Sequence, residues 1–295
     1  MLAACDSSQP ITPANVVGIH DWTQADFTKK ANALAAQGWH PITMSMYGDP
    51  ADPRFAAVFV QGGPAWYGIF NYKFADAQTV FDQQVAKGFL PTILTANGAG
   101  DAMRVSLIFE QHSGPVPLTH WGLPWGDITN PNTTTPATFM DYDAVARAQN
   151  LWLTSVTVYG NPASRLYGGI WSVNSSGALW CCDTGGEALS AFAQRSDAQT
   201  EQLARPAYIT LSGDQQYVGI FRNDMTPATA SVQTDLSHDE YQSQFNSLVP
   251  LGLTPVCLQG GGTGAATRFA AIFVKTTTPQ PRVWQTPVGF PASTK

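Results

Sequence analysis

One pattern recurs five times along this chain, and it restricts the fold more than any other feature. In its first copy, residues 41–46 alternate apolar and polar side chains, the turn Tyr47-Gly48-Asp49-Pro50 follows, and residues 55–60 are almost all apolar. Alternation predicts a strand with one buried face, and a glycine in the next segment suits a turn. A continuous apolar run is typical of a strand buried on both faces. Each copy is therefore expected to supply two strands joined by a turn.

The five copies share one register. The position of Pro41 recurs about every 50 residues, and seven residues after it each copy has a glycine. These glycines are Gly48, Gly98, Gly160, Gly213 and Gly262, and the apolar strands that follow them are 55–59, 105–109, 167–171, 217–221 and 269–273. Five matches in one phase indicate a tandem repeat. We expect the five glycines to hold positive φ and to tolerate β-branched substitutes poorly.

A third strand and a helix complete the unit. Residues 66–70 follow the first buried strand and align with residues 16–20 at the start of the chain. Apolar side chains at helical spacing predict helices between the units. The first set is Phe27, Ala31 and Leu34, and the second is Phe74, Gln78, Phe81 and Val85, with Gln78 as one polar break. The last set is Tyr241, Phe245 and Leu248, behind a Ser237–Glu240 capping box. Gly38, Gly88 and Gly252 are expected to end these helices in the left-handed conformation.

We therefore predict an α+β tandem repeat of five helix-strand-strand-strand units in one array, either closed and propeller-like or open. The strand at residues 16–20 fits both forms, because it can pair with the first unit or join the last. Residues 1–15 are read as a polar lead and residues 16–295 as one repeat domain, with approximate repeats 16–70, 71–125, 137–184, 186–235 and 236–290. The linker at residues 126–136 is expected to be a surface loop.

The composition argues against several classes of function. Of the 295 residues 44% are hydrophobic and only 12% are charged, and the net charge is −6. The sequence has no basic stripe of the kind that binds nucleic acid. It also has no stretch of 18 apolar residues that could span a membrane. Few charges combined with 26 glycines and 21 prolines indicate many turns and an extracellular type of surface. We expect a monomer that is extracellular or at the cell surface.

The amino terminus leaves two interpretations open. Leu2-Ala3-Ala4-Cys5 resembles the processing box of a bacterial lipoprotein, whose cysteine takes a lipid. The charged and apolar regions that precede such a box are missing from the sequence. Either Cys5 carries a lipid anchor or the match is accidental.

Several short motifs together resemble a known family. They are Gly38-Trp39-His40-Pro41, Tyr47-Gly48, Pro53-Arg54-Phe55-Ala56-Ala57-Val58-Phe59 and Gly63-Pro64-Ala65-Trp66. They are similar to the bacterial tandem repeat domain, which also forms the amino-terminal region of polyglycine hydrolases and related β-lactamase-like serine hydrolases. The resemblance covers about residues 16–287 and is a repeat signature that brings no active-site residues with it.

The resemblance implies that catalysis in those relatives resides in a separate downstream domain with Ser-x-x-Lys, Tyr-x-Asn and Lys-Thr-Gly-type motifs. No serine of this chain has a lysine three positions later. Tyr159-Gly160-Asn161 matches the second motif but occupies a turn position of the repeat, and Lys275-Thr276-Thr277 lacks the glycine of the third. The chain therefore resembles the repeat region without the catalytic domain, and we predict no catalytic residue.

Other constellations carry little chemistry. The glycine-rich residues 259–264 precede a strand, whereas a phosphate loop precedes a helix. Cys181, Cys182 and Cys257 lack metal-ligand spacing, and their pairing as disulfides stays open. The five histidines are spread over different repeats, and the packing of tandem units could bring some of them together. A catalytic site assembled between repeats is therefore an alternative. We predict no cofactor and no metal.

Aromatic side chains are the main candidates for ligand binding. Most lie on or beside the third strands, where rings with a polar tip suit stacking on sugars or extended peptide; the alternative is that they belong to the core. The candidate residues are Trp66, Tyr67, His120, Trp121, Trp180 and Trp284, whereas Trp39, Trp152 and Trp171 are placed in core strands. A regular repeat also presents equivalent side chains at intervals that suit an elongated ligand.

The sequence thus favours a non-catalytic secreted or surface module that binds an extended polymer, a peptide or a glycan. Such a module could be the substrate-recognition part of a hydrolase. The alternative is a hydrolase whose active site is assembled between repeats.

Overall fold

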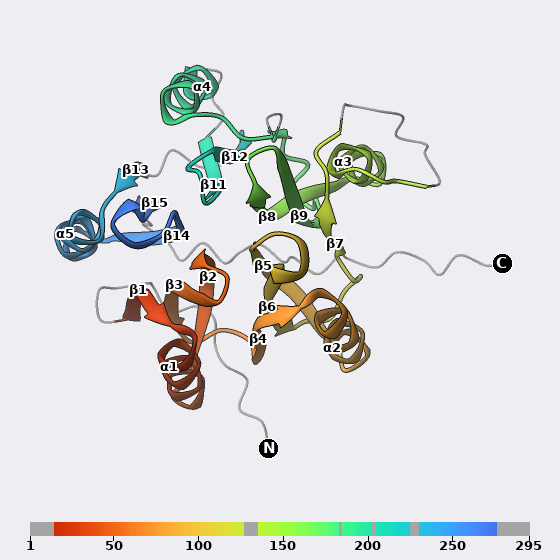
Figure 1. The fold of residues 1–295 in the computed structure, drawn as a ribbon, viewed down its shortest axis with the longest axis horizontal. Coiled ribbons are helices and arrows are strands. Elements are labelled where there is room, and N and C mark those ends of the chain that lie inside the picture. Colours follow the sequence, from red (N-terminus) through yellow and green to blue (C-terminus); the bar gives the residue numbers. More distant parts are fainter. Residues whose placement is uncertain (1–14, 127–134, 183–184, 202–204, 225–229, 276–295) are drawn as a thin grey trace.

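The structure is a computed structural model that describes residues 15–126, 135–182, 185–201, 205–224 and 230–275. Within these residues, five helices and five three-stranded antiparallel sheets recur along the chain. Figure 1 shows the sheets around a common centre with the helices on the outside. No helix of the described part is long and apolar enough to cross a membrane.

Each sheet has an outer, a central and an inner strand (Figure 1). The outer strands are β1 (Val16–Thr23), β4 (Trp66–Lys73), β7 (Leu118–Leu123), β10 (Trp180–Cys181) and β13 (Ala230–Leu236). The central strands are β3 (Asp52–Gln61), β6 (Arg104–Gln111), β9 (Ser164–Val173), β12 (Tyr217–Arg222) and β15 (Arg268–Lys275). The inner strands are β2 (Trp39–Asp49), β5 (Phe89–Asn97), β8 (Leu151–Asn161), β11 (Arg205–Leu211) and β14 (Leu253–Gly261).

The order of elements within a unit differs from the prediction. The strand that follows each central strand does not join that sheet but pairs with the next one, so β4 pairs with β6. The reason is that β3 already has β1 on one edge and β2 on the other. The structural unit is therefore strand, helix, strand, strand, and the leading strand β1 belongs to the first sheet.

The helices are α1 (Gln24–Ala36), α2 (Phe74–Ala86), α3 (Phe139–Ala148), α4 (Leu189–Glu201) and α5 (His238–Leu248). The predicted faces of α1 and α5 are confirmed, and the Ser237–Glu240 capping box is present. In α2 the predicted Phe74, Phe81 and Val85 are partly buried, and Gln78, the polar break in that pattern, is exposed. The buried residues of α2 are Ala77 and Gln84. Gly38 and Gly88 follow α1 and α2 with φ of 80° and 83°, and Gly252, with φ of 82°, ends the short helical turn Val249–Leu251 that continues α5.

The turns between inner and central strands follow the prediction in four units. Gly48, Gly98, Gly160 and Gly262 have φ between 81° and 91°. Gly213 was predicted to do the same but does not have positive φ; Gln215 takes the left-handed conformation there, with φ of 59°. The fourth turn is three residues shorter, so the position of the left-handed residue moves relative to the glycine.

The outer strands share a bulge that interrupts their pairing. The register against the central strand shifts after Ile19 in β1, Ile69 in β4, His120 in β7 and Gln233 in β13. A residue with positive φ sits at each shift, namely Asp21, Asn71, Gly122 and Asp235. The bulge bends the strand and leaves an unpaired stretch on it.

The inner strands contact one another in the order β2, β5, β8, β11 and β14, and β14 also contacts β2. Polar side chains bridge these contacts. The Thr43 hydroxyl of β2 lies 3.2 Å from both the backbone nitrogen and the carbonyl oxygen of Leu258 in β14, so it accepts one hydrogen bond and donates the other. We call such residues the joint side chains; they are Thr43, Ser45, Thr95, Ser155, Thr157 and Cys257, each bonded to the backbone of the preceding inner strand.

The joint side chains correct one expectation. Alternation in residues 41–46 predicted a strand with one buried face. Thr43 and Ser45 are nevertheless as buried as Met44 and Met46, which alternate with them. Their hydroxyls replace the backbone hydrogen bonds that a fourth strand would have supplied, and a buried edge needs such partners. Apolar clusters fill the spaces between neighbouring sheets, and one of them joins residues of β4–β6 to Tyr159 and Ile170, across the linker at residues 126–136.

Candidate functional site

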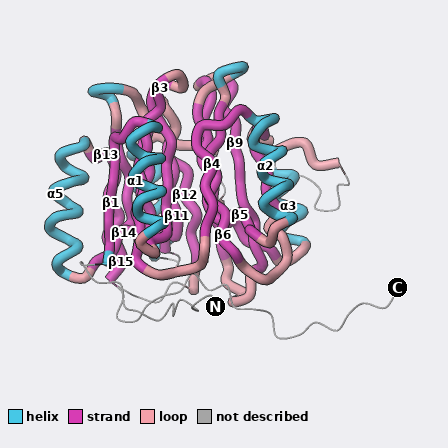
Figure 2. The backbone as a smooth tube through the Cα atoms, turned by 90° about the horizontal axis from the view of Figure 1, so that it is seen from below, coloured by secondary structure: helices cyan, strands magenta, loops and turns pink. Residues whose placement is uncertain are grey.

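The two ends of the sheets differ in the side chains that they expose. Inner and outer strands begin, and central strands end, at one end of the assembly, the lower edge in Figure 2. We call this end the lower face; its side chains include Trp39, Trp66, Tyr67, Trp152, Val173, Leu179 and Trp180. The opposite end carries the turns between inner and central strands and their charged residues, such as Asp52, Arg54 and Arg165.

Exposed apolar side chains gather on the lower face. Of the six large hydrophobic residues that are well exposed in the described chain, five lie there: Tyr67, Val116, Val173, Leu179 and Leu251. The sixth, Tyr72, lies at the other end of β4. A concentration of apolar surface at one end of a molecule is typical of a contact surface.

Trp66 and Trp180 occupy equivalent places on this face, as the sequence predicted. Each begins an outer strand, and they pair with Glu110 and Arg222 at the same register of their sheets. The Trp66 indole N–H donates to the carbonyl of Trp39 at 2.9 Å, and its ring packs on Phe59. Trp66 is therefore partly committed to the core, whereas the neighbouring Tyr67 has 39% of its surface exposed.

Two arginines stack on tryptophans beside these residues. The guanidinium carbon of Arg147 lies 3.7 Å from the ring centre of Trp180, and that of Arg222 lies 3.7 Å from Trp152. Such stacks hold the rings in place by cation–π attraction. Burial would raise the pKa of Asp224, but its bonds with Arg222 and Ser176 outweigh that effect and keep the pKa below its usual value. The third and fourth sheets thus present fixed aromatic and guanidinium groups.

A buried acid lies next to Trp66. The Glu110 carboxylate, on β6, accepts a hydrogen bond from the Thr92 hydroxyl at 3.1 Å and lies 2.9 Å from Nε2 of His112. Glu110 is 5% exposed, whereas the His112 side chain is 22% exposed. The carboxylate therefore orients an imidazole near the aromatic residues of the lower face.

The other predicted site residues lie elsewhere. Trp121 packs against Phe74 and Phe81 between β7 and α2, and His120 lies 3.8 Å from Tyr142, ring centre to ring centre. Burial lowers the pKa of His120. Trp284 lies outside the described residues, as does Cys5. The structure therefore places Trp66, Tyr67 and Trp180 at the same end of the assembly, on two different sheets, but packs Trp121 against α2 and His120 beside Tyr142.

The structure also places the remaining candidates. Trp171 is fully buried, whereas Trp39 and Trp152, predicted as core, are only half-buried because they begin inner strands. Cys181 lies on the outer strand of the fourth sheet, and Cys257 lies on the inner strand of the fifth, where it bonds Ile209. In the described residues no three of His, Cys, Asp or Glu are grouped to hold a metal.

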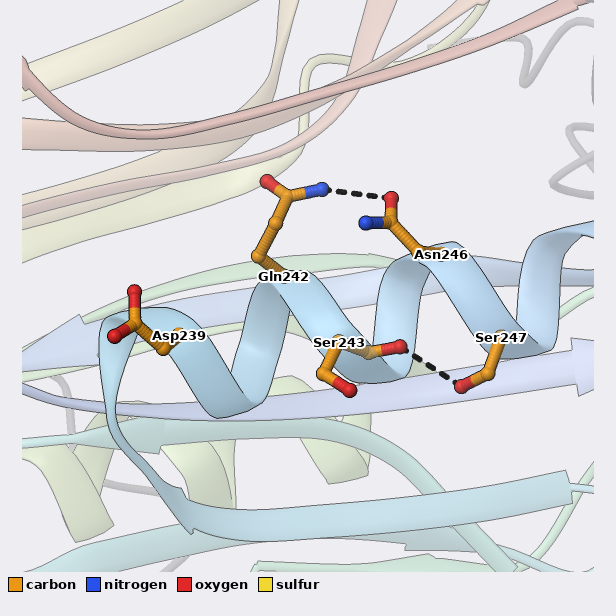
Figure 3. Close-up of a pocket in the computed structure, with 5 residues that line it drawn as sticks. All are labelled: Asp239, Gln242, Ser243, Asn246 and Ser247. Carbon is orange, nitrogen blue, oxygen red and sulfur yellow. Dashed lines mark hydrogen bonds between the residues drawn. The ribbon is translucent and has the colours of Figure 1, made fainter.

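A shallow depression on α5 is lined by polar residues. Figure 3 shows its lining residues Asp239, Gln242, Ser243, Asn246 and Ser247. The Gln242 amide donates to Asn246 Oδ1 at 2.9 Å, and Ser247 donates to the carbonyl of Ser243. Both of these bonds run along the helix, and the depression is lined by α5 alone, so it is the hydrophilic side of α5 rather than a built site.

Sequence reasoning missed the arginine stacks and the Glu110–His112 pair. Arg222 is one residue past a predicted buried strand, and Glu110 holds the same position in the second unit. Charged residues at a position where the first and fifth units have valine were a usable signal. The pairing of Arg147 with Trp180 had no signal, because the two are 33 residues apart.

A comparison with protein-family models supports the repeat pattern. The model described as polyglycine hydrolase-like, structural repeat matches residues 17–62, 63–112, 134–174 and 231–276. These segments make up more than half of the chain, and their spacing follows the units seen in the structure. The fourth unit is not among the matches, and it is also the one with the displaced left-handed residue and the two-residue outer strand. On this evidence the chain belongs to the polyglycine hydrolase-like structural repeat family.

Proposed function

We propose that this chain is a non-catalytic repeat module, secreted or displayed at the cell surface, that binds an extended and weakly charged polymer on its lower face. The observation that carries the proposal is the gathering of exposed apolar and aromatic side chains at that end, with Tyr67 and the stacked Trp180 among them. Peptide and glycan are the two ligand classes that this surface suits. As part of a larger hydrolase, such a module would recognise the substrate.

The chemistry of the face supports a neutral ligand. Its arginines Arg147 and Arg222 are already paired with Asp143 and Asp224. Ionic recognition would compete with these pairs, whereas stacking on rings and hydrogen bonds to indole or phenol tips would not. Only 12% of the residues are charged, which also favours a neutral ligand and an extracellular location.

The proposal takes the array as closed and propeller-like. Contacts between β14 and β2, with the two bonds of Thr43 to Leu258, support closure, because they join the last unit to the first. In a closed array the five lower ends of the sheets form one continuous surface. A long ligand could then lie across several units at once.

A matched pair of variants tests the binding face. Tyr67 and Tyr72 lie on the same strand with nearly equal exposure, 39% and 38%, but at opposite ends. Binding of glycine-rich peptides and of cell-wall glycans is measured by tryptophan fluorescence and calorimetry. We expect Tyr67→Ala to weaken binding by about tenfold, the loss of one stacking contact of roughly 1.4 kcal/mol, and Tyr72→Ala to leave it unchanged. Equal effects of the two variants, or no binding by the unsubstituted chain, would rule the proposal out.

A hydrolase with a site between repeats is the second candidate, and the Glu110–His112 pair is the observation in its favour. A carboxylate that orients an imidazole is what a general base requires. Serine-reactive fluorophosphonate and thiol-reactive probes distinguish the two functions. Stoichiometric labelling of one residue that His112→Gln abolishes would support the enzyme, and indifference to both probes would support the binding module.

A further inference from the structure

The first and fifth units, which are far apart in the sequence, meet along a seam between β1 and α5. The seam is tightly packed: a Cβ atom added at Gly18 of β1 would lie 2.7 Å from the Phe245 ring of α5. An apolar cluster spans it, with Val16 and Val58 on one side and Tyr241 and Phe273 on the other. The imidazole of His20 is buried within this packing and is only 7% exposed.

Hydrogen bonds define the protonation state of His20. Its Nε2 lies 3.1 Å from Oε1 of Gln242, whose amide nitrogen already donates to Asn246 (Figure 3). Gln242 Oε1 can only accept, so His20 carries a proton on Nε2. Its Nδ1 is buried without a hydrogen-bond partner among the described residues. A second proton would have to bind Nδ1, where no acceptor among the described residues could take its hydrogen bond, so the buried ring is neutral.

The surroundings of His20 oppose a positive charge. The ring of His238, on α5, is 4.2 Å away, and the rings of Tyr241 and Phe269 are 4.9 Å and 5.4 Å away. The ionisable groups in contact with it or acting on its charge are His238 and Tyr241 from α5 and Asp21 from its own strand, and β15 contributes the Phe269 ring. Burial is the main cause that lowers the pKa of His20, with His238 acting in the same direction; the bond to Gln242 and the charge of Asp21 oppose them.

We propose that His20 is a pH-sensitive latch at the seam between the first and fifth units: the seam is closed while His20 is neutral and opens when it is protonated. The proton enters at Nδ1 and converts a neutral ring in an apolar setting into a cation beside His238. Opening of the seam exposes that nitrogen to water, which accepts its hydrogen bond.

The direction of the pH dependence follows from proton linkage. The closed seam holds the pKa of His20 below 6.5, the value that the exposed ring would have, so the open form binds more protons than the closed one. The seam keeps its full stability above about pH 6.5 and loses it as the pH falls through the interval below. Within that interval the opening constant increases by up to about tenfold for each pH unit.

Hydrogen–deuterium exchange of the full chain tests the latch. Exchange of the β1 and α5 amides is followed from pH 7.5 to pH 5 after correction for the intrinsic pH dependence of exchange, with α2 as the internal reference. We expect seam amides to lose protection by more than tenfold relative to α2. In His20→Phe, which keeps an aromatic ring and cannot titrate, that extra loss is expected to disappear. His120→Gln is the control, because His120 is a partly buried histidine away from the seam, on β7, and its replacement should leave the seam response intact.

Two outcomes would overturn the proposal. One is a seam in His20→Phe that loses protection with falling pH as much as the unsubstituted chain does. The other needs no variant: if NMR shows that His20 takes up its proton by pH 5 while β1 and α5 keep their protection, protonation does not open the seam. This second measurement decides the matter even if the variant fails to fold.

Discussion

At the scale of single residues, the repeat glycines look alike in the sequence but differ in what surrounds them. Gly48 and Gly98 hold φ of 86° and 85°. A Cβ atom at Gly48 would meet nothing closer than 3.8 Å, whereas one at Gly98 would lie 2.3 Å from the carbonyl oxygen of Ala102. The left-handed conformation could be predicted from the turn pattern, but the close approach at Gly98 could not, because it depends on the short helical turn at Gly100–Ala102.

The difference gives a prediction for two matched substitutions. Gly48→Ala is expected to lower the free energy of unfolding by about 1 kcal/mol, the cost of a left-handed residue with a Cβ atom. Gly98→Ala is expected to cost at least about twice as much, because the backbone around Ala102 must also move. Urea denaturation of both variants measures this. Equal losses would show that the contact at Gly98 is easily relieved.

The candidate site shows the same limit on prediction from sequence. Trp66 and Tyr67 are neighbours and were both predicted to bind a ligand, yet the Trp66 indole bonds Trp39 while the Tyr67 side chain is among the most exposed aromatic groups. Alternation along a strand predicts that the two rings point to opposite faces. It does not predict which of the two faces the next sheet covers.

At the scale of elements, the strands and helices could largely be predicted, but not their pairing. The turns, the glycine caps and the capping box depend on local geometry, and they were confirmed in most units. The assignment of the third strand to the next sheet depends on which edges are already occupied, which is a property of the assembled sheet. The burial of Thr43 and Ser45 was missed for the same reason, since another unit covers them.

The joint side chains provide the prediction at this scale. Thr43→Val keeps the shape of the side chain but leaves the backbone N–H and carbonyl of Leu258 without their bonds to it. We expect a loss of about 1–3 kcal/mol in the free energy of unfolding, the cost of an unsatisfied buried polar group.

Thr119→Val is the control for this substitution. Thr119 is a partly exposed threonine of β7 whose hydroxyl bonds only Pro117 nearby. Its replacement should change stability by less than about 0.5 kcal/mol. Comparable midpoints of thermal unfolding for the two variants would mean that the joint hydroxyls do not stabilise the contact between units.

At the scale of the whole molecule, the proposed closure changes how the protein should unfold. In an open array the end units have one neighbour each and open first. In a closed array every unit has two neighbours, so all five are expected to lose protection together in one transition.

Pulsed hydrogen exchange at increasing urea, read separately for each unit, distinguishes these cases. Coincident midpoints for the five units are the expected result. Earlier opening of the first and fifth units than of the third, at neutral pH where His20 is uncharged, would show that the array is open.

The bulges of the outer strands have a consequence for contacts between molecules. Five sheets expose five outer edges, and a straight edge strand is a template on which another chain can add a strand and start aggregation. Proteins commonly prevent this with charged residues, but only 12% of this chain is charged. The left-handed residues Asp21, Asn71, Gly122 and Asp235 bend four of these edges instead, and the fifth, β10, is only two residues long. We therefore expect the bent and shortened outer strands, two of them with an acidic residue at the bulge, to oppose the addition of a strand from another molecule.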